Sequence, residues 1–355
     1  MLTMRRQQAG MAIAGILAVL TGCGGGSSSS DGGRAPYKAV FKEMPIPVVS
    51  NDPSANPTGS WPDDVRTDAL GNVWFAQHHS DEVGKMSASG VYVGYKVPTA
   101  SSFMDGIVVD QTRKVVWASE TKTNKLARID MTTGAVTELT LLRADVVPGD
   151  LVTAPDGTIW FTEGYEGGVA KGRIAHLDPD TRTVTEFTPP NNPNTCDGIA
   201  VASSGAVWFV ENDNNSIACY DKGAFQTFPL PRPSVNPTNI AIDSQGQIWV
   251  TEQYGNAIAV FDVGKNLWKE YTIPSSSGQP SGIAIDAHDN IWFTEFGSGK
   301  IGVLPSGSGT IVDFPIPTAD SGPEDITIAA DGSIYFTEQN ANKIGQISVA
   351  GLTAR

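Results

Sequence analysis

The amino-acid sequence predicts an all-β fold, a seven-bladed β-propeller, from three observations. A strand centred on an aromatic residue recurs seven times, from Val73-Trp74-Phe75 to Ile334-Tyr335-Phe336. The aromatic positions are 43, 43, 48, 41, 43 and 43 residues apart, a period typical of a four-stranded propeller blade. The 355 residues include 38 glycines and 23 prolines but only 17% charged residues, a composition that favours many short strands joined by turns.

The first 22 residues have the pattern of a signal peptide. Arg5 and Arg6 precede an apolar run, 9–20, that is too short to cross a bilayer as a helix of the mature protein. The run ends in Leu20-Thr21-Gly22-Cys23, which resembles the bacterial lipobox. The resemblance implies that residues 1–22 are removed and that Cys23 is acylated; an ordinary signal peptide followed by a chance cysteine is the alternative.

This N-terminal pattern predicts a location as well as an anchor. We expect acylated Cys23 to hold the protein in the lipid bilayer of the cell envelope. The glycine- and serine-rich residues 23–36 then form a flexible tether to an extracytoplasmic domain. In a Gram-negative host the pattern resembles that of outer-membrane lipoproteins, because no aspartate directly follows Cys23.

The repeats predict one domain, residues 37–355, with four strands in each unit. Strand A is short and apolar, strand B contains the aromatic residue, strand C follows a polar turn, and strand D alternates in polarity and ends in proline. The seventh unit stops after strand C, at 344–348. Residues 40–47 closely copy strand D of the sixth unit, 311–317. We therefore expect the N-terminal strand to supply the outer strand of the last blade and close the ring.

The repeat motifs resemble those of the streptogramin (virginiamycin B) lyase family. They are Pro-x-x-Ile on strand A, Trp-Phe-Thr-Glu on strand B and Asn-x-Ile-Gly on strand C, and the resemblance covers residues 37 to about 348. It implies a seven-bladed, Mg²⁺-dependent carbon–oxygen lyase that linearises a cyclic depsipeptide by elimination at its ester. The family's histidines directly follow the strand-A proline in the last two blades, and an acidic residue precedes the last of these prolines.

This chain departs from the family at those positions. Ser281 and Glu324 follow the prolines, and Gly322 replaces the acidic residue. A serine hydroxyl cannot accept a proton unaided at neutral pH, and a glutamate can do so only with a raised pKa. Two hypotheses therefore stay open: a module that binds a small molecule, peptide, protein or metal, and a lyase or other metal-assisted enzyme acting on cyclic esters or lactones.

The charge distribution narrows the possible partners. The net charge of −14 argues against nucleic acid as a partner. We also expect the protein to be a monomer. Acidic residues recur where strand A begins in most units: Asp63, Asp64, Asp105, Asp150, Asp197, Glu324 and Asp325. If they face the mouth of the channel, they favour Mg²⁺, Ca²⁺ or a cationic partner. Capping of local turns is the alternative role.

Two further departures from the repeat give candidate site residues. In the first unit, His78 and His79 follow strand B at the same end of the blade as Asp63 and Asp64. Such a set can bind a divalent metal or act as acid and base, and a solvated polar turn is the alternative. In the third unit, five extra residues including Tyr165 and Glu166 lengthen the same rim, either as a recognition loop or as a neutral insertion.

Other recurrent residues suggest structural roles. A glutamate three residues after the aromatic position occurs in six units, and we expect it to accept hydrogen bonds at the turn between strands B and C. The tryptophans are expected to pack between blades. Cys196 and Cys219 lie on strands that are not neighbours, roughly 9–10 Å apart, so two free thiols are predicted.

Overall fold

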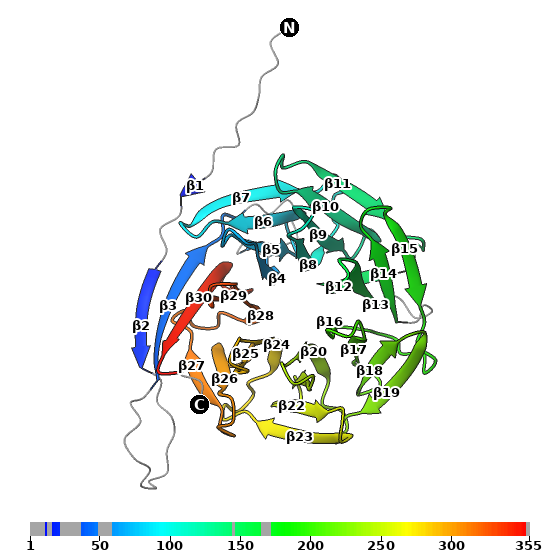
Figure 1. The fold of residues 1–355 in the computed structure, drawn as a ribbon. Helices are drawn as coiled ribbons and strands as arrows, with labels where there is room; N and C mark the ends of the chain where they lie inside the picture. Colours follow the sequence, from blue (N-terminus) through cyan, green and yellow to red (C-terminus); the bar gives the residue numbers. More distant parts are fainter. Residues whose placement is uncertain are drawn as a thin grey trace, which may run out of the picture.

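Seven antiparallel sheets lie around a central axis, as the sequence predicts (Figure 1). The structure is a computed structural model that describes residues 11–12, 16–21, 37–48, 59–143, 146–164 and 172–352. The innermost strand of each blade, from first to seventh, is β4 (Pro62–Thr67), β8 (Met104–Asp110), β12 (Val147–Thr153), β16 (Ile199–Val201), β20 (Pro237–Ile242), β24 (Pro280–Ile285) and β28 (Pro323–Ile328).

The aromatic strands come second in each blade. They are β5 (Val73–Gln77), β9 (Val115–Glu120), β13 (Ile159–Gly164), β17 (Val207–Glu211), β21 (Ile248–Glu252), β25 (Ile291–Glu295) and β29 (Ile334–Glu338). The third strands are β6 (Glu82–Met86), β10 (Lys125–Asp130), β14 (Arg173–Asp178), β18 (Ser216–Asp221), β22 (Ala257–Asp262), β26 (Lys300–Leu304) and β30 (Lys343–Ala350). The fourth strands are β7 (Val91–Lys96), β11 (Val136–Thr140), β15 (Thr183–Phe187), β19 (Ala224–Pro229), β23 (Leu267–Thr272), β27 (Val312–Pro315) and β3 (Lys38–Pro45).

The N-terminal strand closes the ring. Strand β3 pairs antiparallel with β30, from Lys38 opposite Ala350 to Pro45 opposite Lys343. Phe41 on β3 is fully buried and meets the ring of Phe336 edge-on, with centroids 6.2 Å apart. The predicted closure is confirmed, so the seventh blade combines the two ends of the propeller domain.

Two short strands precede the propeller domain. Strand β1 (Met11–Ala12) pairs with β7, and β2 (Ile16–Thr21) pairs with β3, so two blades have a fifth strand where the sequence predicts four (Figure 1). Cys23 and the rest of the predicted tether, 23–36, lie outside the described residues. Cleavage before Cys23 would remove both extra strands and leave β3 and β7 as outer edges.

The hydrophobic core lies between blades. Each core cluster of the described residues joins two neighbouring blades, so every one of the seven interfaces has its own cluster. At the first interface, Trp74 of the first blade packs with Val116 and Ala118 of the second. The expectation that the tryptophans pack between blades is confirmed, and the ring is stabilised by contacts that repeat around the axis.

The recurrent glutamates are structural, as expected. All six are fully buried: Glu120, Glu163, Glu211, Glu252, Glu295 and Glu338. Glu120 accepts a hydrogen bond from Thr123, and Glu252 pairs with Arg232 at 2.5 Å. Burial, reinforced by the neighbouring Glu43, raises the pKa of Glu338 to about 9. These carboxyl groups are therefore enclosed at the ends of the aromatic strands and do not present a surface to a ligand.

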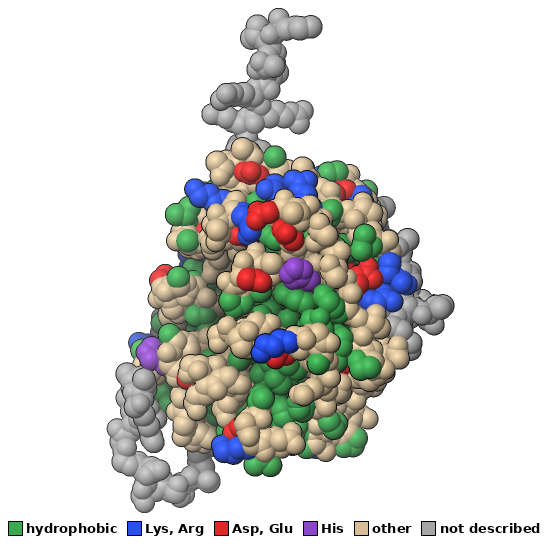
Figure 2. Space-filling model, turned by 45° about the vertical axis from the view of Figure 1, so that its right-hand side comes forward, with side chains coloured by type: hydrophobic (Ala, Val, Ile, Leu, Met, Phe, Trp, Pro, Cys, Tyr) green, Lys and Arg blue, Asp and Glu red, His purple; other side chains and the backbone are tan. Residues whose placement is uncertain are grey.

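The surface shows no single charged field on the face that Figure 2 views, where acidic and basic side chains lie among hydrophobic ones.

Both cysteines of the fourth blade, Cys196 and Cys219, are buried and free, which confirms the prediction of two thiols. Within the described part of the chain, no helix is long and apolar enough to span a membrane.

Candidate functional site

A β-bulge at the start of the innermost strand turns two consecutive residues toward the axis. In the first blade, Pro62 lies opposite Gln77 and Val65 opposite Phe75, so Asp63 and Asp64 together face one residue of β5. The second, third, fifth, sixth and seventh blades show the same shift in register. A bulge breaks the alternation of a strand and re-aims its side chains. Both residues of the pair can therefore line the centre of the ring.

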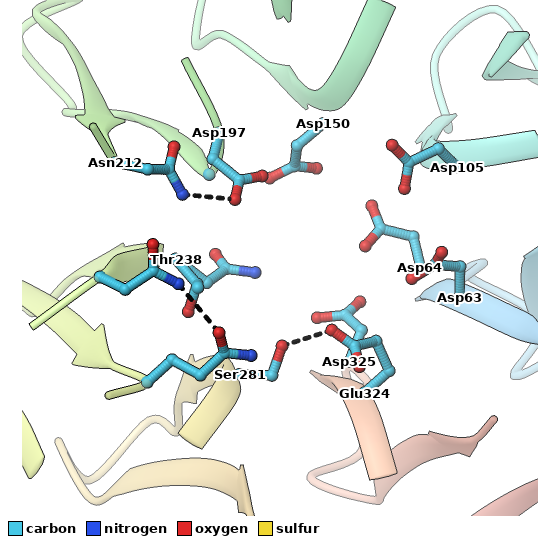
Figure 3. A pocket seen from close by; sticks show the side chains of 14 residues that line it. Asp63, Asp64, Asp105, Asp150, Asp197, Asn212, Thr238, Ser281, Glu324 and Asp325 are labelled. Carbon is cyan, nitrogen blue, oxygen red and sulfur yellow. Dashed lines mark hydrogen bonds between the residues drawn. The ribbon is translucent and has the colours of Figure 1, made fainter. Parts of the chain in front are cut away.

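These paired residues surround a cavity of about 280 Å³ (Figure 3). Its acidic lining residues are all seven that the sequence predicts, Asp63, Asp64, Asp105, Asp150, Asp197, Glu324 and Asp325. The other lining side chains are amides and hydroxyls, namely Asn212, Asn236, Thr238, Asn239, Gln253 and Ser281. The cavity thus has an acidic side and a neutral polar side, the latter from the fourth to sixth blades.

Arg66 forms ion pairs with three of the carboxylates, and we call Asp64, Asp150 and Asp325 the paired carboxylates. The Arg66 guanidinium lies 3.3, 3.2 and 2.5 Å from them, respectively. Each paired carboxylate also accepts a hydrogen bond from a backbone amide of the next blade, as Asp325 does from the Val65 amide at 2.9 Å. Burial raises the pKa of Asp64 and of Asp150, and Arg66 offsets part of that rise. The paired carboxylates therefore hold blades together.

Sequence reasoning missed Arg66. It lies on the same strand as Asp64 and two residues after it, a spacing that places both side chains on one face of a strand. That spacing was the available signal, because a basic residue beside an acidic ring is the natural counter-ion. The bulge and the distance between blades were needed to show that one guanidinium reaches three carboxylates.

The remaining four carboxylates form no ion pair with any described residue, and we call Asp63, Asp105, Asp197 and Glu324 the open carboxylates. Asp197 accepts a hydrogen bond from Asn212 at 2.9 Å, and Glu324 accepts one from Ser281 at 2.5 Å (Figure 3). They lie deep in the ring, yet their side chains keep some surface open to the cavity. They are the acidic groups that a ligand in the cavity would meet.

The open carboxylates have raised pKa values for a shared reason. Burial, then the charges of Asp197 and Asp150, raise the pKa of Asp105 to about 7. The same burial raises the pKa of Asp197 to about 6, although the Asn212 hydrogen bond opposes the rise. Burial also raises the pKa of Asp63 well above its ordinary value, with Asp105 as the next cause. The cavity therefore holds more negative charge than its surroundings stabilise, and it takes up protons near neutral pH.

Ser281 and Glu324 occupy the positions where the family resemblance implies histidines. Both line the cavity, and the Ser281 hydroxyl donates to the Glu324 carboxylate across the interface of the sixth and seventh blades. Burial raises the pKa of Glu324 to about 7, while the Ser281 hydrogen bond partly opposes the rise. Glu324 thus meets the condition under which a carboxylate at this position can exchange a proton near neutral pH.

The structure does not bring the predicted metal ligands together. His79 stacks on Trp61 with ring centroids 4.4 Å apart, and His78 lies edge-on to Phe103 at 5.1 Å. Burial, then the charges of His79 and Lys122, lower the pKa of His78 to about 4.

Neither histidine lines the cavity that Asp63 and Asp64 line. Among the described residues, no three side chains of His, Cys, Asp or Glu lie close enough to hold a metal ion. The physical reason is that the bulge turns the two aspartates to the axis while aromatic side chains hold the imidazoles at the rim. Tyr165 and Glu166 of the inserted loop lie outside the described residues.

Comparisons with known proteins agree with the repeat motifs. The chain matches the family described as the Virginiamycin B lyase family over residues 51–291 and 263–355. A solved streptogramin B lyase is 28% identical, with a TM-score of 0.77 and coverage of 88% of this chain and 98% of that one. Virginiamycin B lyase from Staphylococcus aureus is 28% identical, with a TM-score of 0.76 and coverage of 87% and 99%.

A catalytically inactive histidine-to-alanine variant of the Staphylococcus aureus enzyme, solved with quinupristin, is also similar. It is 27% identical, with a TM-score of 0.77 and coverage of 87% of this chain and 99% of that one. No curated protein matches the chain.

Proposed function

Because this chain belongs to the virginiamycin B lyase family, we propose that it uses the family's scaffold and central cavity to bind a small organic cation, and that it does not open cyclic esters. The observation that supports this proposal most directly is the set of four open carboxylates in that cavity. The lipobox-like sequence supports a lipid anchor at Cys23 and an extracytoplasmic location for this binding module.

The charge of the cavity supports a cationic ligand. Burial and mutual repulsion both penalise ionisation of Asp63 and Asp105. A bound cation offsets that penalty, because it stabilises the charged form of every carboxylate near it. Amides and hydroxyls on the neutral side, such as Asn236 and Thr238, offer hydrogen bonds that would orient the rest of the ligand.

The same charge argues against ester elimination. Removal of a proton beside an ester carbonyl places negative charge on the carbonyl oxygen, and enzymes lower that barrier with positive charge or hydrogen-bond donors. Here no basic side chain of the described residues lines the cavity, and the guanidinium of Arg66 is already shared by the three paired carboxylates. Four open carboxylates would repel the developing charge.

The Mg²⁺ ion that the family resemblance implies does not fit the residues present. Gly322 has no side chain to contribute, and Ser281 is hydrogen-bonded to Glu324. No group of three suitable ligands lies within reach among the described residues. We therefore propose an organic cation as the ligand, and divalent metals become a separate arm of the test.

Isothermal titration calorimetry tests this proposal. We expect 1,4-diaminobutane to bind at pH 8 and to bind more weakly at pH 5, where the open carboxylates hold protons that compete with the ligand. Asp105→Asn should weaken binding about tenfold or more, because it removes an ionic hydrogen-bond acceptor. Asp331→Asn, in an exposed turn between β28 and β29, is the matched control and should leave the affinity unchanged.

Three outcomes would contradict the proposal. The first is the absence of any binding at pH 8, and the second is equal weakening by the two variants. The third is binding of Mg²⁺ or Ca²⁺ without binding of the diamine.

Proton abstraction by Glu324 is a second candidate function. The pKa of about 7 and the position of Glu324 beside Ser281 favour it. Elimination would break the ester C–O bond and give an alkene and a carboxylic acid, an isomer of the substrate, whereas hydrolysis would add one water. Incubation with virginiamycin B, followed by chromatography and mass measurement, distinguishes these products. We expect the cyclic compound unchanged; a linear isomer that disappears with Glu324→Gln would establish the lyase instead.

A further inference from the structure

The tryptophan of the aromatic strand has the same hydrogen-bond partner in three blades. An aspartate directly after the innermost strand, six residues before the tryptophan, accepts the indole N–H. The pairs are Asp68 with Trp74, Asp243 with Trp249, and Asp286 with Trp292, at 2.9, 2.9 and 3.0 Å. Each aspartate also accepts two backbone amides of the turn that follows it, from the residues two and four positions later.

The fourth blade lacks this acceptor. Ala202 stands in place of the aspartate, and the indole N–H of Trp208 has no hydrogen-bond partner among the described residues. The backbone turn is nevertheless the same, because the Ala202 amide donates to Ala206 at 2.8 Å as the Asp243 amide donates to Gln247 at 3.1 Å. Trp208 is only 5% exposed. Since a buried donor without a partner is costly, its N–H is a polar group that a ligand could satisfy.

A cavity of about 490 Å³ opens at this position, between the fourth and fifth blades, which are neighbours in the ring (Figure 1). Its lining residues are Ala202, Ser203, Ser204, Ala206, Trp208, Cys219, Asp221, Ala224, Gln226, Phe228, Gly246 and Val263. The cavities that follow the first and fifth blades at the equivalent place are smaller, about 360 and 250 Å³, and each is lined by the aspartate as well as the tryptophan. The loss of the aspartate thus coincides with a larger cavity, of a volume typical of small-molecule sites.

The buried part of the lining is apolar apart from the indole N–H. Ala206, Trp208 and Cys219 are buried. Burial raises the pKa of the Cys219 thiol to about 11, so this group stays neutral at physiological pH. The ring of Trp208 is already stacked on Phe228, with centroids 5.5 Å apart. The edge of the indole that carries the N–H, and not its face, is therefore the recognition group.

The charges around the cavity favour a neutral ligand. The cavities after the first and fifth blades are lined by Lys85 and Lys269, which lie over aromatic rings, whereas Cys219 and Gln226 hold the equivalent positions here. No basic side chain lines this cavity in the described part of the chain, and Asp221 would repel an anion. The apolar buried end also disfavours a cation, because an ion there would lose its hydration without an ionic partner.

We propose that this cavity is a second binding site, for a neutral and mainly apolar small molecule whose carbonyl oxygen accepts the hydrogen bond of the Trp208 indole N–H. The carbonyl oxygen takes the place that an aspartate carboxylate has in the first, fifth and sixth blades. The apolar body of the ligand fills the cavity beside Phe228 and Val263. This site does not depend on the proposed function, because the two cavities share no lining residue.

A matched pair of compounds tests the site in the full chain. 1-Indanone and indane have the same bicyclic skeleton, but indane lacks the carbonyl oxygen. We expect the ketone to bind about fivefold more tightly, because only the ketone satisfies the buried donor. Nitrogen-15 NMR titration measures both affinities, and the ketone should move the indole N–H signal of Trp208 downfield. Trp208→Phe identifies that signal by its absence, and this variant should lose the preference for the ketone while it still binds indane.

The variant Ala202→Asp copies the other three blades and should abolish binding of the ketone, because its carboxylate accepts the indole N–H and fills part of the cavity. It should also accept the backbone amides of the turn, so the melting temperature should stay the same or rise. Loss of binding then cannot result from unfolding. Ala330→Asp adds the same charge in an exposed turn of the seventh blade, and as the control it should leave the ketone affinity unchanged.

Two results would overturn the site. The first is equal affinity of the unmodified protein for the two compounds, or binding of neither. The second is a ketone affinity that Ala202→Asp leaves intact. Binding of 1,4-diaminobutane should be unchanged by Ala202→Asp, so failure of this site and failure of the proposed function are separate results.

Discussion

Arg66 forms ion pairs with Asp64, Asp150 and Asp325, which belong to the first, third and seventh blades. This one residue thereby divides seven carboxylates into a structural set and a set that a ligand can meet. Both sets of carboxylates carry an energetic cost for the folded protein. A charge left in the ring without its partner destabilises the fold, whereas the open carboxylates avoid that cost only by holding protons.

Replacement of Arg66 should destabilise the protein strongly. We expect Arg66→Met to lower the free energy of unfolding by about 3–5 kcal/mol at pH 8, because three buried carboxylates lose their counter-ion. The loss should be smaller at pH 5, where those carboxyl groups can take up protons. Chemical denaturation at the two pH values measures both effects. Lys265→Ala removes an exposed ion pair with Asp262 and should change stability by less than about 1 kcal/mol.

The innermost strands pack by alternating side chains with glycines at the second residue of the bulge, or at the equivalent position of the fourth blade. Along the seven blades these residues are Asp64, Gly106, Asp150, Gly198, Asn239, Gly282 and Asp325. A Cβ atom on Gly282 would lie 2.7 Å from the Cα atom of Asp325 in the next blade. The glycines therefore let neighbouring strands approach closely, and the side chains between them bridge blades. This close packing of neighbouring innermost strands forms the wall of the cavity.

Loss of strand β3 should lower the stability of the whole ring. Deletion of residues 37–48 removes the eight-residue pairing with β30 and the buried side chain of Phe41. We expect a large fall in melting temperature within a single cooperative transition, because the first and seventh blades share a core cluster. A chain that begins at residue 23 is the control, since it keeps β3. Retention of the full melting temperature by the deletion would contradict closure by this strand.

At the scale of the whole molecule, many buried acids hold protons in the folded state that they lose when unfolded. Burial is the first cause in each case, and it raises the pKa to about 7 for Glu120, Glu252 and Glu295 as well as for Asp105 and Glu324. For Glu338 the value is about 9. Between the ordinary pKa near 4.5 and these folded values, the folded chain binds more protons than the unfolded chain, so stability falls as pH rises.

The protein should therefore be more stable in mild acid than in mild alkali. We expect the melting temperature to rise as the pH is lowered from 9 to about 5. Below about pH 4 it should fall again, because hydrogen bonds hold the pKa of Asp286 down despite its partial burial, and that stabilisation is lost on protonation. Glu338→Gln should raise stability at pH 9 and flatten the profile. A maximum near pH 8 would contradict this assignment of protonated buried acids.

Much of the fold was predictable because the repeat is local and regular. The periodicity of one unit was enough to predict the aromatic strands, their spacing and the copied strand D. The fifth strands formed by 11–12 and 16–21 were not predictable, because pairing at an outer edge depends on which edge a distant segment meets. The histidines show the same limit: His78 and His79 follow Gln77 in the chain, yet Trp61 and Phe103, distant in sequence, determine their surroundings.

The sequence by itself determined seven units, their closure by the N-terminal strand, the acidic character of the strand-A starts and the replacement of the family's histidines by Ser281 and Glu324. These follow from residue identity at repeated positions. Only the tertiary structure decided which acids Arg66 pairs and which stay open in the cavity. The physical reason is that a bulge changes where consecutive side chains point, and charge pairing depends on distances between blades that are remote in the chain.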